Sequence, residues 1–175
     1  MNTDLDYVTI FDNVISKKNC EKLIKIYKKT VIKEKGSTEN YYYTDIDVRN
    51  FSYNKEIFEC IEKYKINYPE INLTVSYWGL VNLRFKFWKK GDFFNQFHSE
   101  HCFSRPNRLL SLQIYLSDHD CGTEFYNKKV IKSKVGRVCL FPAYFTHTHK
   151  GQPDLTKNRY LITGYFEFFK LGKFE

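Results

Sequence analysis

Histidine and acidic side chains in the second half of the chain are spaced so that they could bind one metal ion. His98 and Glu100 are separated by one residue, and side chains two positions apart point to the same face of a β-strand. A third ligand has to come from a distant segment, and His147 and His149 are both candidates. Because these two are also two residues apart, strand alternation places both on one face and leaves the choice open.

Two histidines and one carboxylate point to a particular kind of metal chemistry. When they occupy one face of an octahedron, three coordination positions stay open, which is the arrangement of non-haem iron(II) oxygenases. The same donors also suit zinc, so a hydrolase with a zinc-bound water is an alternative. A His-x-Glu pair alone is weak evidence, since surface hydrogen bonding accounts for most such pairs. Other features at fitting distances have to support the metal site.

Two further residues favour a site that also binds an organic anion. Arg159 lies ten residues after His149, and a buried arginine there could form a bidentate pair with a dicarboxylate co-substrate. Tyr115 follows an apolar residue in a predicted strand, and its hydroxyl could donate a hydrogen bond to the same carboxylate. Together these residues favour an iron site that works with an organic co-substrate.

The first third of the chain predicts two helices. Ser16 is a favourable N-cap for a helix over residues 17–29, in which apolar residues recur at helical spacing. A second amphipathic helix is expected over residues 54–65. The residues expected on its apolar face are Ile57, Phe58, Ile61 and Tyr64. Residues 33–50 are polar and rich in tyrosine, which predicts a loop or an irregular segment.

From residue 72 onward the pattern changes to that of β-strands. Apolar residues alternate with polar or small ones, mostly at a period of two, and turns separate the candidate strands. These candidates are residues 72–87, 95–101, 109–116, 123–126, 137–141, 144–148 and 159–169. Many short strands at this spacing predict an all-β sandwich or jelly roll. We expect one domain over residues 1–175, mainly β, with a helical N-terminal part at about 1–70 and a β-barrel core at about 71–170.

Composition narrows the class of protein. The 175 residues are 42% hydrophobic and 27% charged, as in ordinary globular domains. The five cysteines include no Cys-x-x-Cys pair, which leaves a zinc knuckle or redox motif without support. No apolar run is long enough to span a bilayer, and the polar first residues do not read as a signal peptide. We therefore expect no membrane association and a cytoplasmic location, the host cytoplasm if the chain is viral.

With these motifs in view, the sequence resembles the iron(II)- and 2-oxoglutarate-dependent oxygenases. It is most similar to their prolyl 4-hydroxylase-like branch, which has viral and phage members. The resemblance runs from about residue 7 to residue 168. Its most specific pieces are His98-Ser99-Glu100, residues 108–118, Gly122-Thr123-Glu124-Phe125, Phe141-Pro142, His149-Lys150-Gly151 and Arg159-Tyr160.

The resemblance implies both a fold and a ligand set. The fold is a double-stranded β-helix, the jelly roll that the strand pattern also suggests. His98, Glu100 and His149 would bind iron(II), and Arg159 and Tyr115 would hold the distal carboxylate of 2-oxoglutarate. The implied cofactors are Fe(II), 2-oxoglutarate and O2, with ascorbate as an optional reductant.

The sequence departs from the family pattern at two positions. The first motif of the family is usually His-x-Asp, whereas Glu100 is one methylene longer. Many members place Ser or Thr two residues after the arginine, but this chain has Leu161 there, which leaves fewer partners for the co-substrate. The ten-residue interval to Arg159 favours His149 over His147 as the distal ligand, and His147 would then be a pocket or packing residue. We expect His101 at the surface or in a substrate cleft, and His119 solvated in a turn.

The activity that the resemblance implies is hydroxylation of a C–H bond, with a peptidyl proline as the substrate and a peptide or protein as the partner. A metal-free jelly-roll binding module is one alternative. A nucleic-acid-directed oxygenase is another, because the net charge is +8. The lysines are scattered and no known nucleic-acid-binding motif accompanies them, so a solvated surface explains the charge better. The sequence does not specify the substrate further.

Overall fold

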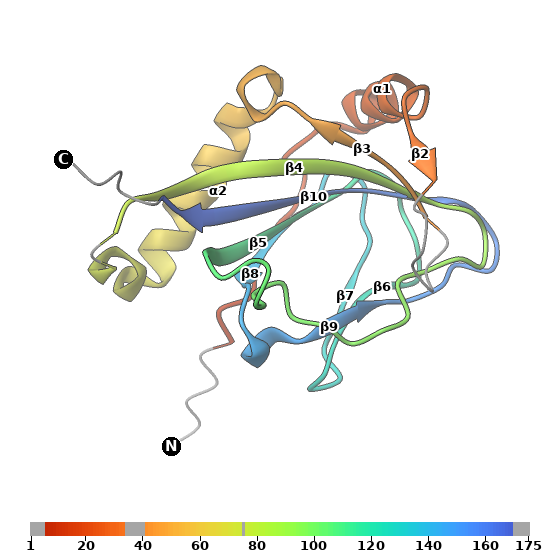
Figure 1. The fold of residues 1–175 in the computed structure, drawn as a ribbon. Coiled ribbons are helices and arrows are strands. Elements are labelled where there is room, and N and C mark those ends of the chain that lie inside the picture. The colour runs from red at the N-terminus through yellow and green to blue at the C-terminus, as the bar shows by residue number, and fades with distance from the viewer. Residues whose placement is uncertain (1–5, 34–40, 75, 170–175) are drawn as a thin grey trace.

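The computed structural model describes residues 6–33, 41–74 and 76–169 (Figure 1). Its helices and strands lie mostly where strand and helix patterns are found in the sequence. In chain order they are β1 (Thr9–Phe11), α1 (Lys17–Tyr27), β2 (Ile32–Lys33), β3 (Tyr42–Ile46), η1 (Val48–Asn50), α2 (Asn54–Asn67), η2 (Pro69–Leu73), β4 (Trp78–Trp88), β5 (Arg108–Tyr115), β6 (Gly122–Phe125), β7 (Val130–Lys132), β8 (Val138–Pro142), η3 (Phe145–His147), β9 (His149–Gly151) and β10 (Arg159–Phe168).

The strands form two antiparallel sheets. The major sheet has seven strands in the order β1-β8-β5-β10-β4-β3-β2, and the minor sheet has three in the order β7-β6-β9. Figure 1 shows α1 and α2 on one side of the major sheet and the minor sheet on the other. This arrangement confirms the predicted fold class, mainly β with N-terminal helices and a jelly-roll core. Among the described residues, neither helix has the length and apolar content that crossing a membrane requires.

Alternation along β4 divides the interior into two clusters. Leu83, Phe85 and Phe87 point toward the helices and pack with residues such as Leu23 and Ile61. Trp88 points to the opposite face, where it packs in a second cluster with buried residues of both sheets. The second cluster lies between the sheets, and the candidate site is built beside it.

Both predicted helices are present, but the buried face of α2 differs from the prediction. The Ser16 hydroxyl accepts a hydrogen bond from the Asn19 amide at 3.3 Å, as expected of an N-cap. In α2, Phe58 is 65% exposed, and Cys60 is buried in its place. The buried residues of α2 recur at i, i+3, i+4 and i+7 and are Ile57, Cys60, Ile61 and Tyr64. Phe58 lies about 100° around the helix from Ile57 and therefore faces away from this stripe.

Three segments were predicted wrongly. Residues 33–50 contain β3, which pairs with β4, and η1, although residues 34–40 of this segment lie outside the described part. Residues 95–101 form no strand, only a single bridge between His98 and His149. Residues 144–148 contain η3, and the strand begins at His149. For residues 33–50 and 95–101, pairing with a distant segment decides the backbone, and local alternation does not report that pairing. Residues 144–148 instead form local hydrogen bonds, in which the amides of His147 and Thr148 donate to the carbonyls of Tyr144 and Phe145.

Candidate metal centre and adjoining cavity

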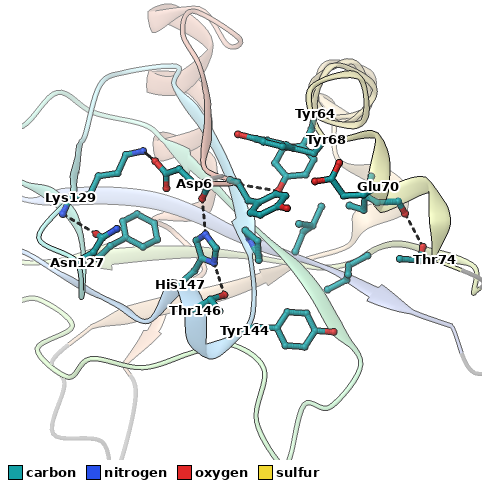
Figure 2. A pocket seen from close by; sticks show the side chains of 16 residues that line it. Asp6, Tyr64, Tyr68, Glu70, Thr74, Asn127, Lys129, Tyr144, Thr146 and His147 are labelled. Carbon is teal, nitrogen blue, oxygen red and sulfur yellow. Dashed lines mark hydrogen bonds and ion pairs between the residues drawn. The ribbon is translucent and has the colours of Figure 1, made fainter. Parts of the chain in front are cut away.

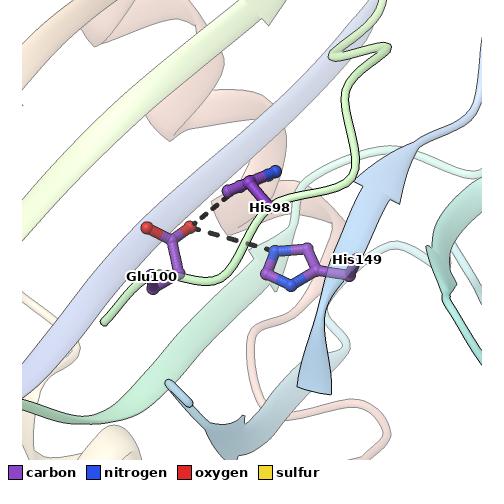
Figure 3. A group of neighbouring side chains, drawn as sticks. All are labelled: His98, Glu100 and His149. Atoms are coloured by element: carbon purple, nitrogen blue, oxygen red, sulfur yellow. Dashed lines mark ion pairs between the residues drawn. The ribbon is translucent and has the colours of Figure 1, made fainter. Parts of the chain in front are cut away.

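Three predicted ligands converge between the two sheets. His98 Nε2 lies 3.4 Å from Glu100 Oε1, and His149 Nε2 lies 3.9 Å from the same oxygen. One ligand atom from each residue lies within 4.8 Å of the other two. Figure 3 shows both rings turned toward the carboxylate, with His149 carried by β9. Two nitrogens and one oxygen therefore face a common point, as a three-ligand metal site requires.

Backbone contacts fix the orientation of both histidines. The amides and carbonyls of His98 and His149 exchange hydrogen bonds of 3.0 and 2.9 Å, so the two residues are held opposite each other. His98 Nδ1 lies 3.0 Å from the Gln96 carbonyl, and His149 Nδ1 lies 3.0 Å from the His147 carbonyl. Because a carbonyl only accepts, each Nδ1 donates there, and each Nε2 is the ring nitrogen turned toward Glu100.

The charge states of the ligands also suit a cation. Burial lowers the pKa of His149 to about 4, so its ring is neutral and able to coordinate at neutral pH. Burial alone would raise the pKa of Glu100, but the hydrogen bond with His98 and the nearby Lys86 ammonium outweigh burial, and the net direction is downward. The carboxylate is therefore ionised.

Arg108 restrains the Glu100 carboxylate from one side. Its Nη1 donates a 2.8 Å hydrogen bond to Oε2 of Glu100, whereas Oε1 faces the two histidines. The arginine also stacks on Tyr165, with 3.5 Å between the guanidinium carbon and the ring centre. One carboxylate oxygen is thus occupied by Arg108, and the other is directed toward the metal position.

A cavity extends from the three ligands to Arg159. The guanidinium is 5% exposed, and its two terminal nitrogens donate to the carbonyls of Gln152 and Gly122. None of the ion pairs found in the described part of the chain includes Arg159. A buried cation without a carboxylate partner is costly, and an anionic ligand in the cavity would supply that partner. Other residues lining the cavity include Lys86, Trp88, Phe94, Gln113, Thr123, Leu161 and Thr163.

Two buried polar atoms of the same cavity have no hydrogen-bond partner among the described residues. They are Nε1 of Trp88 and Oγ1 of Thr163, on side chains that are 4% and 5% exposed. Both residues line the same cavity as the arginine, and buried donors left without partners are uncommon in proteins. A buried cation and two partnerless polar atoms fit an oxyanion-bearing ligand such as a dicarboxylate. The sequence reading passed over Trp88 and Thr163, although Thr163 shares a strand face with Arg159 and Leu161 by alternation.

Tyr115 lies one layer behind this cavity. Its hydroxyl is 2.7 Å from Oε1 of Gln113 and 2.9 Å from Oγ1 of Thr123, and both of those residues line the cavity. The tyrosine is buried, and burial raises the pKa of its hydroxyl, which therefore stays protonated. Its predicted contact with a co-substrate stays a prediction.

His147 takes no part in the ligand cluster. It ends η3, so the alternation that placed it beside His149 does not apply. Its Nε2 donates to the Asp6 carbonyl at 2.7 Å, at the wall of a different and larger cavity that is also lined by Tyr64, Tyr68 and Tyr144 (Figure 2). None of the three ligands lines that cavity.

The expectation that His119 is solvated was wrong. Its side chain is buried, with Nδ1 at 2.5 Å from Oδ2 of Asp154 and Nε2 at 2.7 Å from Oγ of Ser117. Cys121 also lies close to the pair, but the two hydrogen bonds already use both ring nitrogens, so we assign no metal site there. His101 is half-buried and packs on Tyr144, with ring centres 4.5 Å apart.

Known structures supply an independent comparison. The sequence matches no family model, and a search of curated proteins found no match either. A viral collagen prolyl hydroxylase from Paramecium bursaria Chlorella virus-1, solved with 2OG, superposes with a TM-score of 0.74 at 19% identity, covering 95% of this chain and 98% of that one. The chain has the fold of that hydroxylase.

Two further structures superpose over most of their length. A prolyl-4-hydroxylase from Pseudomonas putida gives a TM-score of 0.70 at 11% identity, with 93% of both chains covered. A prolyl hydroxylase from Trichoplax adhaerens, in complex with a hypoxia inducible factor peptide fragment, gives 0.68 at 17% identity and covers 94% of this chain and 84% of that one. At these identities the likeness concerns the fold alone.

Proposed function

We propose that this protein is an iron(II)- and 2-oxoglutarate-dependent oxygenase that hydroxylates a C–H bond in a peptide, with a peptidyl proline as the favoured target. One observation carries the proposal. The ligand atoms of His98, Glu100 and His149 meet at one end of a cavity, and the cavity also contains Arg159, a buried cation without a carboxylate partner in the described residues. That pairing fits a metal chelated by a 2-oxo acid whose distal carboxylate reaches the arginine.

The solved structures support the same assignment. Those with this fold include hydroxylases whose names specify collagen or prolyl substrates, one of them bound to 2OG and one to a peptide. A peptide is therefore the partner we favour. A metal-free binding module does not require three convergent metal ligands. A zinc hydrolase does not require a buried arginine in the same cavity.

Each residue has a defined task in the proposed reaction. When bound, iron and 2-oxoglutarate supply the oxidising chemistry that activates O2. His98, Glu100 and His149 would hold the metal through two nitrogens and one carboxylate oxygen. Arg159 binds the distal carboxylate and so orients the co-substrate. Phe125 and Phe141 lie against the His149 ring, with centres 5.7 and 4.9 Å away, and exclude water from that side.

Two histidine variants test this proposal sharply. His149→Ala should abolish iron(II) binding. His147→Ala removes a histidine two residues away whose ring nitrogens bond the Asp6 carbonyl and the Thr146 hydroxyl, and it should leave binding within a few-fold of wild type. The measurement is an anaerobic titration with iron(II) and then 2-oxoglutarate, followed by the visible charge-transfer absorption of the chelate. Succinate release in air is the second readout.

The outcomes separate the alternatives. Wild-type protein that binds iron and gives no absorption change with 2-oxoglutarate would contradict the co-substrate assignment. Protein that retains zinc through purification and releases no succinate would favour a hydrolase. Loss of iron binding in His147→Ala and not in His149→Ala would refute the ligand set itself.

A further inference from the structure

The face of the major sheet that carries the cavity continues well beyond it. Along β4, alternation places the side chains of Trp88, Lys86 and Arg84 on one face of the sheet. Their paired residues on the neighbouring strand β10 lie on the same face and are Arg159, Leu161 and Thr163. The cavity that adjoins the minor sheet includes Trp88 and Lys86. Arg84 lies beyond the cavity and lines an open groove on the same face.

We call this second depression the basic groove. Its cationic side chains are Arg84, Lys86, Arg105 and Arg108, and Glu167 is the acidic residue that lines it. Arg84 pairs with Asp45 at 2.7 Å. Arg105 is exposed, and none of the ion pairs found among the described residues involves it. Carboxylates therefore neutralise part of the positive charge of the groove, and Arg105 is the cation that is open to a ligand.

The basic groove adjoins the metal position directly. Lys86 lines both the groove and the cavity. Arg108 lines the groove and donates to Glu100 at 2.8 Å. If Glu100 serves as a metal ligand, the positive charge of the metal offsets that carboxylate, and Arg108 is compensated chiefly by its 3.5 Å pair with Glu167. A chain lying in the groove would have a neighbouring segment within reach of the metal.

We propose that the basic groove binds an acidic stretch of the peptide substrate next to the residue that is hydroxylated. The proposal deepens the proposed function and rests on it. Arginine forks match carboxylates in geometry as well as charge, and rim charges of this kind contribute chiefly to selection of the partner.

The groove suits an acidic peptide better than a nucleic acid. Single-stranded nucleic acids are held by exposed aromatic rings on which bases stack. Tyr165 is the aromatic residue that lines the groove among the described residues, and it is 6% exposed with the Arg108 guanidinium over its ring. No ring in the described lining is open to a base.

Three proline-containing peptides of equal length test the proposal, with flanks of Glu and Asp, of Gln and Asn, or of Lys and Arg. Binding to the full chain, loaded anaerobically with iron(II) and 2-oxoglutarate, is followed by fluorescence anisotropy. The acidic peptide should bind most tightly, and Arg105→Glu should weaken it by roughly two- to fivefold, since an exposed charge pair contributes up to about 1 kcal/mol. Arg105→Lys should restore most of the affinity, and raising the salt should reduce the difference.

Lys132→Glu is the matched control, because it makes the same charge change on β7 of the other sheet, at an exposed residue. It should leave the preference for the acidic peptide intact. Equal binding of all three peptides, or equal effects of Arg105→Glu and Lys132→Glu, would overturn the basic groove as a peptide site. Tighter binding of a single-stranded oligonucleotide than of the acidic peptide would also overturn it. Failure to bind iron or 2-oxoglutarate would instead refute the proposed function, so the two failures are distinguishable.

Discussion

Replacing Arg159 by methionine should separate ligand binding from stability. Within the described part of the chain, the hydrogen bonds of this buried guanidinium go to two backbone carbonyls, one of them at a long 3.5 Å. Losing those bonds costs about 1–2 kcal/mol, and removing a buried charge that lacks a counter-ion offsets part of that cost. Methionine keeps much of the length and packs against Trp88. We therefore expect the melting temperature to change by no more than about 5 °C.

The effect on 2-oxoglutarate should be far larger. At 5% exposure, the pair between Arg159 and a carboxylate is almost unscreened by water. Removing one partner of such a buried pair costs about 3–5 kcal/mol, which corresponds to a loss of affinity of at least about 100-fold. The assay is the anaerobic iron(II) titration with 2-oxoglutarate, in parallel with thermal unfolding of the metal-free protein.

A co-substrate analogue makes the experiment specific. 2-Oxopentanoate keeps the 2-oxo acid end and lacks the distal carboxylate, so its affinity should be nearly the same in wild type and Arg159→Met. Arg137→Met is the control variant, because Arg137 already pairs with Asp12 at 2.7 Å and should not affect 2-oxoglutarate. Unchanged 2-oxoglutarate affinity in Arg159→Met, or equal losses for both acids, would refute the role assigned to this arginine.

Two further predictions concern Tyr115 and Asp154. Tyr115→Phe should lower the free energy of unfolding by about 1 kcal/mol and weaken 2-oxoglutarate binding severalfold. The Tyr64 hydroxyl donates to a backbone carbonyl, so the control variant Tyr64→Phe should lower stability alone. Equal losses of 2-oxoglutarate affinity in both variants would contradict the assignment. Burial opposes ionisation of Asp154, but hydrogen bonds from Thr156, His119 and Lys157 outweigh it and hold its pKa below the ordinary value. Its contribution to stability is therefore present above a pH of about 4 and lost as the pH falls. Asp154→Asn should be less stable at neutral pH and lose less stability on acidification, as measured by urea unfolding across pH; parallel curves would contradict this.

The sequence alone determined most of the architecture and narrowed the candidate metal ligands to a few residues. Period-two alternation is a property of the chain itself, so the strands β4, β5, β8 and β10 could be found without their partners. The same holds for α1, because Ser16 caps it locally. His98 and Glu100 are two residues apart, which is close enough for both side chains to reach one ion even though no regular strand forms around them.

Strand alternation left His147 and His149 equivalent, and only the tertiary structure separates them geometrically. Their separation in sequence gives both an equal claim on a strand, but η3 turns His147 toward Asp6, and the bridge to His98 turns His149 toward Glu100. The tertiary structure also decided that His119 and Trp88 are buried. It likewise left Arg159 without a carboxylate partner among the described residues. Burial and partnership depend on which distant segments meet, and that information is not contained in local spacing.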